Sequence, residues 1–118
     1  MLARANRVTK PADFRMVVRS GRRVVSPNVV VYVLSRVTIG PDRVGPSRCG
    51  FIVTKAVGNA VIRNTVRRRL REACRAVLPT LNGSTDIVIR ALPGSPEVAW
   101  ATLQAELTES INRGVMKR

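Results

Sequence analysis

The sequence has no histidine, and acidic residues are scarce: 7 Asp and Glu stand against 21 Lys and Arg in 118 residues. A histidine general base is therefore excluded. The scattered acids do not group into the carboxylate set that a two-metal nuclease site requires. We therefore expect neither a catalytic side chain nor a protein-bound metal.

Aromatic residues make up 3% of the chain, whereas 45% is hydrophobic, so Val, Ile, Leu and Ala must build the core. No apolar run approaches the 18 residues of a membrane span, and the N-terminus lacks the apolar region of a signal peptide. We expect a cytoplasmic protein that is not inserted in a membrane. The length predicts one domain over residues 1–118, with flexible basic tails at 1–8 and 114–118.

Cysteine is also rare, with Cys49 on a predicted strand and Cys74 on the apolar side of a predicted helix. Without histidine or a CxxC pair, a metal site or a disulfide has little support. We expect two buried, reduced thiols.

A net charge of +14 is the strongest feature of the composition. Such an excess repels itself and favours a polyanionic partner: a nucleic acid, an anionic membrane or an acidic protein. Arginine dominates the basic residues, and its planar fork grips phosphate in a bidentate manner. The composition therefore favours a nucleic acid.

The order of predicted elements is α-β-β-β-α-β-α. Proline at position 11 and glycine at position 21 are typical of a helix start and stop. β-Branched density predicts the strands, and Ser95 with Pro96 predicts the start of the last helix. The expected fold is α+β, a two-layer sandwich with helices on a four-stranded sheet and a βαβ crossover before the last strand. The predicted elements are a helix over 11–20, strands over 22–25, 28–35, 49–55 and 86–91, a helix over 60–78 and a helix from 96.

The segment from Phe51 to Leu78 organises the chain, because its helix separates into two faces. At about 100° per residue, one narrow arc is apolar and faces the core. The opposite arc carries arginines at four-residue spacing, which repel one another unless phosphates neutralise them. The predicted core arc holds Ile62, Val66, Leu70, Ala73 and Val77, with Cys74 at its edge; the basic arc holds Asn64, Arg67, Arg68, Arg71 and Arg75, with Arg63 and Arg69 beside the core arc.

KAVGNAVIRNTVRRRLRE resembles the signature segment of the bacterial ribonuclease P protein family. The likeness extends to NRVTKPADFRMVVRSG, VVVYVL and DIVIRA. It implies a ribosomal protein S5 domain 2-like fold with a left-handed crossover. It also implies a subunit that binds the catalytic RNA and the 5′ leader of precursor tRNA, with Mg²⁺ held mainly by the RNA. No small-molecule substrate is implied.

The resemblance assigns roles position by position. The residues that match the family's RNA-binding helix are Asn59, Arg63, Asn64, Arg67, Arg68 and Arg71, and those that match its leader cleft are Phe14, Val18, Tyr32 and Lys55.

Three positions depart from the family pattern: Thr65 replaces an arginine, Ala56 replaces a lysine, and Val18 replaces a cleft aromatic. Two alternatives remain open. One is a ribosomal-protein-like RNA binder without a processing role, and the other is a small DNA-binding protein.

Overall fold

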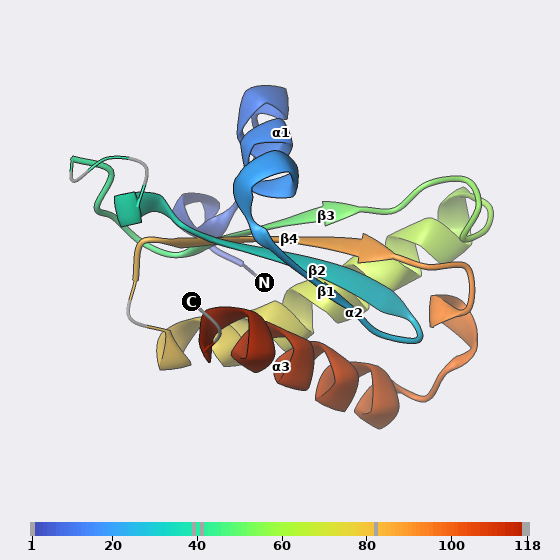
Figure 1. The fold of residues 1–118 in the computed structure, drawn as a ribbon. Helices are drawn as coiled ribbons and strands as arrows, with labels where there is room; N and C mark the ends of the chain where they lie inside the picture. The colour runs from blue at the N-terminus through green and yellow to red at the C-terminus, as the bar shows by residue number, and fades with distance from the viewer. Residues whose placement is uncertain (1, 39, 41, 82, 117–118) are drawn as a thin grey trace.

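The computed structural model describes residues 2–38, 40, 42–81 and 83–116. Its helices and strands follow the predicted order (Figure 1). The elements are α1 (Pro11–Ser20), β1 (Arg22–Val25), β2 (Val29–Ser35), β3 (Arg48–Ile52), α2 (Ala60–Val77), β4 (Thr85–Ala91) and α3 (Trp100–Met116), with 3₁₀ turns η1 (Arg4–Asn6), η2 (Arg36–Thr38), η3 (Leu78–Thr80) and η4 (Ser95–Glu97).

The strands form one mixed sheet in the order β1-β2-β4-β3. β2 pairs antiparallel with both β1 and β4, whereas β3 and β4 are parallel. Parallel neighbours need a crossover, and α2 provides it. The predicted βαβ unit is therefore confirmed.

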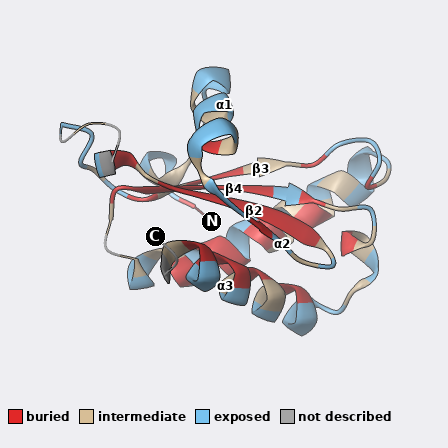
Figure 2. Cartoon of the chain, viewed as in Figure 1, coloured by how far each residue is buried: buried red, intermediate tan, exposed pale blue. Residues whose placement is uncertain are grey.

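One face of the sheet is buried against α2 and α3 (Figures 1 and 2). Alternate residues of β2 and β4 point to this face, as the strand period of two requires. Completely buried side chains from the sheet and both helices fill the core: Val29, Val31, Ile87, Ile89, Leu70, Leu103, Leu107 and Ile111.

Among the helices that the structure describes, α1 is the one that packs on the opposite face of the sheet. Val17 from α1 packs with Tyr32 and Val88 in a second, smaller cluster. The ring of Phe14 lies directly over Gly50, where an added Cβ would be 2.6 Å from a ring carbon. Glycine at this position therefore lets the helix approach β3 closely.

The N-terminal segment is packed, in contrast to the flexible tail we predicted for 1–8. Leu2 is 3% exposed and Val8 is 5% exposed. The backbone N–H of Val8 donates to the carbonyl of Cys49, so this segment covers part of the edge of β3. At the other end, α3 continues to Met116, and Gly114 within it is buried. Positions 1, 117 and 118 of the predicted tails lie outside the described residues.

The last helix begins later than predicted. Ser95 starts a separate 3₁₀ turn, and Val98 is extended (φ −88°, ψ 150°), so α3 starts only at Trp100. The Ser95 hydroxyl is buried and finds no hydrogen-bond partner among the described residues, so it caps no helix. Trp100 in the first turn of α3 is 37% exposed and lies beside Glu72 and Arg75 of α2.

Candidate nucleic-acid interface

α2 presents a buried side and a basic side, as its sequence pattern predicted. Val66, Leu70, Ala73 and Val77 are buried, and Cys74 is completely buried rather than at the edge of the core. Ile62 corrects the prediction, because it is 38% exposed. This isoleucine lies in the first turn, before the helix passes beneath the sheet, and packs against the turn at Gly58 instead.

The arginine side chains of α2 differ in how far they are exposed to solvent. Arg68, Arg71 and Arg75 are exposed, whereas Arg63 and Arg69 are half-buried. The Nε of Arg63 is buried without a partner among the described residues. Exposed guanidinium groups on one helix face can each bind a phosphate through two hydrogen bonds.

Arg67 is half-buried and held in place at the end of β3. Its Nη2 donates to the carbonyl of Val53 at 3.3 Å, and its Nη1 donates to Asn64 Oδ1 at 3.2 Å. These bonds limit the side chain's freedom before any ligand arrives, so less entropy is lost when a phosphate binds.

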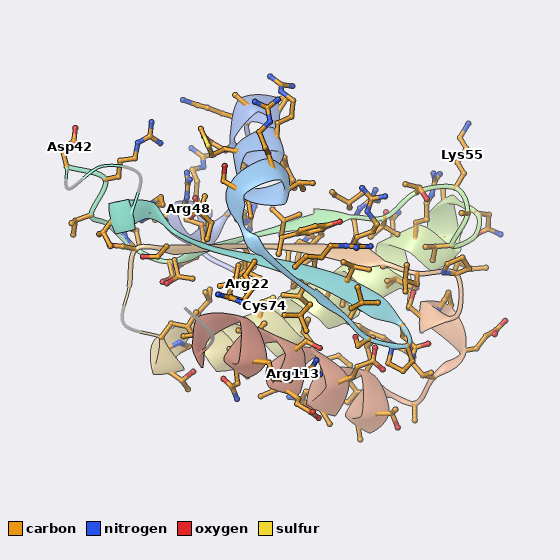
Figure 3. All side chains as sticks on the ribbon, viewed as in Figure 1. Arg22, Asp42, Arg48, Lys55, Cys74 and Arg113 are labelled. Atoms are coloured by element: carbon orange, nitrogen blue, oxygen red, sulfur yellow. The ribbon has the colours of Figure 1, made fainter. Side chains whose placement is uncertain are left out.

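The turn before α2 is built for a tight change of direction. Gly58 has φ 156°, and a Cβ there would lie 2.8 Å from the side chain of Ile62. Asn59 caps the helix, since its Oδ1 accepts from the Ile62 N–H at 3.0 Å. Lys55 is exposed and points away from the body of the protein on the α1 side of the sheet (Figure 3).

The predicted cleft residues gather where α1 crosses the sheet. Phe14 and Val18 are half-buried against the cluster that contains Tyr32. Tyr32 itself is 7% exposed, so most of its ring packs under α1. The structure therefore brings these three together, whereas Lys55 lies beyond the end of β3.

Arg90 is a basic residue that the sequence reasoning did not select. It pairs in register with Val30 and Ile52, and its side chain is exposed on the α1 face of the sheet. The segment DIVIRA could have indicated this residue. Arg90 lies two positions after Val88, so both side chains are on the same face of the strand, and Arg90 is a charged residue in an otherwise apolar stretch.

A buried ion-pair network fixes α1 to the sheet, and it was also not foreseen. Asp86 in β4 is 3% exposed and pairs with both Arg36 and Arg48. Arg48 also lies 3.5 Å from the carboxylate of Asp13 in α1. The hydrogen bonds to Asp86 raise the pKa of Arg48 above its ordinary value, with burial acting in the opposite direction.

Both cysteines are free and buried, as expected. Burial raises the pKa of the Cys74 thiol well above its ordinary value, and the contact with Cys49 adds to this effect. Thiols in such surroundings are inert core groups. Over the residues described, no cluster of three or more metal-ligating side chains is found, and no helix is long and apolar enough to cross a membrane.

When the chain is compared with known protein families, the family model described as Ribonuclease P matches residues 2–114. The chain belongs to the ribonuclease P protein family. The ribonuclease P protein component of Clavibacter michiganensis subsp. michiganensis is 50% identical over 115 residues, which cover 98% of this chain and 97% of that protein. The protein of the same description from Pseudarthrobacter chlorophenolicus is 47% identical, with coverage of 96% and 82%.

Solved structures agree with the ribonuclease P fold. The Staphylococcus aureus RNase P protein has a TM-score of 0.79 at 26% identity, covering 93% of this chain and 95% of that one. The Thermotoga maritima RNase P protein has a TM-score of 0.74 at 24% identity, with coverage of 91% and 96%, and at this identity it supports the fold alone. The resemblance that the α2 segment carries is thereby confirmed at the level of family and fold.

Proposed function

We propose that this chain is the protein subunit of a ribonuclease P holoenzyme. In this proposal the RNA subunit holds the Mg²⁺ ions and performs the endonucleolytic cleavage that removes the 5′ leader from precursor tRNA. The protein binds both RNAs in the cytoplasm. The observation that carries the proposal is the basic face of α2, where Arg68 and Arg71 are exposed on a helix whose start is capped by Asn59.

The α2 face is the proposed contact with the catalytic RNA. A partner's phosphates would relieve the repulsion between arginines four residues apart, such as Arg67, Arg71 and Arg75. Asn59 uses its Oδ1 for the cap and keeps its side-chain NH₂ to donate to RNA. The proposed contacts are Asn59, Arg63, Asn64, Arg67, Arg68 and Arg71.

The face of the sheet that carries α1 is the proposed site for the leader. Phe14, Val18 and Tyr32 form an apolar wall and floor, and Arg90 supplies a charge beside them. Lys55 lies between this face and the start of α2. Because α1 and α2 lie on opposite faces of the sheet, the two RNAs would not compete for the same surface (Figure 1).

A cleavage assay tests the proposal. Precursor tRNA and the cognate catalytic RNA are incubated over a range of Mg²⁺ concentrations, with and without the protein. We expect the protein to lower the Mg²⁺ needed for cleavage and to strengthen binding of precursor over mature tRNA. If neither changes while RNA binding persists, the chain is a general RNA binder of the ribosomal-protein type.

The DNA-binding alternative is separated by competition. Duplex DNA and the catalytic RNA are compared at the same salt concentration, because phosphate contacts make both affinities depend strongly on salt. Tighter binding to the catalytic RNA is expected. Equal affinity for both would support the DNA reading instead.

A further inference from the structure

A cavity of about 380 Å³ lies where the end of α2 meets the N-terminal segment. We propose that it binds one unpaired nucleotide of the catalytic RNA, with the base between apolar side chains and the phosphate on Arg75. The proposal rests on the proposed function, because it takes the catalytic RNA as the partner. The residues that line the cavity are Leu2, Ala3, Asn6, Ser47, Arg75, Leu78, Pro79, Leu81 and Gly83.

The N-terminal wall of this cavity is held by specific bonds. The guanidinium of Arg7 folds back and donates to the carbonyl of Leu2 at 2.6 and 3.0 Å. The side-chain Nδ2 of Asn6 donates to the carbonyl of Ser47 at 2.8 Å. The side chain of Arg7 therefore holds the N-terminal segment in place, so this wall of the cavity is formed before any ligand binds.

The size and lining of the cavity suit a single nucleotide. Its volume is near the lower end of the roughly 300–1,000 Å³ typical of ligand sites, which excludes a duplex. Leu78, Pro79 and Leu81 offer apolar surface for the faces of a base. The Oδ1 of Asn6 has no donor among the described residues, so it is available to accept from a base amino group.

The charge of the site favours RNA over a protein segment. Arg75 continues the four-residue spacing of Arg67 and Arg71, so the cavity extends the basic face of α2. No carboxylate is among the described residues that line it. Arg75 pairs with Glu72 at 3.3 Å, but both side chains are largely exposed, and such pairs are weak enough for a phosphate to displace.

A pair of matched variants tests the cavity. Ala3→Trp places a large side chain at the lining of the cavity, whereas Ala5→Trp adds the same side chain two residues later, in the 3₁₀ turn η1 and outside the lining. Both alanines are exposed, so both chains should fold. We expect Ala3→Trp to weaken binding of the catalytic RNA about fivefold or more, the effect of losing one stacked base, and Ala5→Trp to bind as the wild type does.

Crosslinking of the wild-type complex gives a second readout that needs no variant. After irradiation with short-wave ultraviolet light, mass spectrometry should find a single nucleotide attached to a peptide from residues 2–6 or 78–83. Wild-type binding without such a crosslink, together with equal affinities of Ala3→Trp and Ala5→Trp, would overturn the nucleotide site and leave the proposed function intact. Failure of the wild type to bind the catalytic RNA would instead reject the proposed function.

Discussion

The guanidinium of Arg48 in β3 grips the carboxylate of Asp86 in β4 through two hydrogen bonds, at 2.9 and 2.7 Å. The same carboxylate pairs with Arg36, which is 7% exposed. Asp13 of α1 approaches Arg48 from the other side at 3.5 Å. One buried acid therefore joins two neighbouring strands and, through Arg48, the helix that forms a wall of the proposed leader site.

Asp86→Ala should destabilise the fold by about 3–5 kcal/mol, because it leaves the buried charge of Arg36 without its partner. Urea unfolding followed by circular dichroism measures the loss. Glu109→Gln is the matched control, since Glu109 and Arg113 form an exposed pair at 3.9 Å. That change should stay within about 0.5 kcal/mol. Equal effects of both variants would contradict a special role for Asp86.

Arg71→Ala should weaken binding to the catalytic RNA and reduce the salt dependence of binding by about one unit of slope. Arg71 is exposed on the basic face of α2, so its removal should not disturb the core. Arg113→Ala removes the same charge from α3, where Arg113 is also exposed. Filter binding over a series of salt concentrations compares the two. A salt slope that changes equally in both variants would show that only net charge matters.

Local patterns were sufficient to predict α1 and α2. The cap at Asn59 and the separation of arginines from apolar residues depend on neighbours within one or two turns. Ile62 was predicted in the core because helical periodicity does not contain the position at which the sheet ends, and its exposure depends on that position. Ser95 was misread because a cap signal does not reveal that the backbone turns extended again at Val98.

Long-range contacts explain the remaining differences at the candidate site. Asp13, Arg36, Arg48 and Asp86 come from four separate elements, and no spacing rule connects them. The prediction of a loose N-terminal arm failed for a similar reason, since Leu2 is buried by residues distant in sequence. The roles of the predicted RNA contacts stay predictions until binding is measured.

Alkaline pH should destabilise the protein through Cys74. Burial raises the pKa of this thiol in the folded state, whereas in the unfolded chain it ionises near about 8.5. Above that pH the unfolded chain loses a proton that the folded chain keeps, so the free energy of unfolding falls as pH rises. One such group contributes at most about 1.4 kcal/mol per pH unit.

Urea unfolding at a series of pH values tests this contribution. The series runs from neutral pH to about 1.5 pH units above the ordinary pKa of a thiol. Cys74→Ala will be less stable at neutral pH because it leaves a cavity, but its stability should fall less steeply with pH. All other side chains are the same in both proteins, so the difference in slope reports the Cys74 thiol. Parallel pH profiles would contradict the prediction.

Val18→Phe should increase the preference for precursor over mature tRNA, because it adds an aromatic surface where the family pattern has one. Val18 is half-buried at the edge of the cluster around Tyr32. One stacked base contributes about 1–3 kcal/mol, so the affinity for precursor tRNA should rise about fivefold or more, with mature tRNA unchanged. Met16→Phe is the control, since Met16 is exposed on another side of α1. If Met16→Phe raised the affinity equally, or if both tRNAs gained equally from Val18→Phe, the leader would not contact this side of α1.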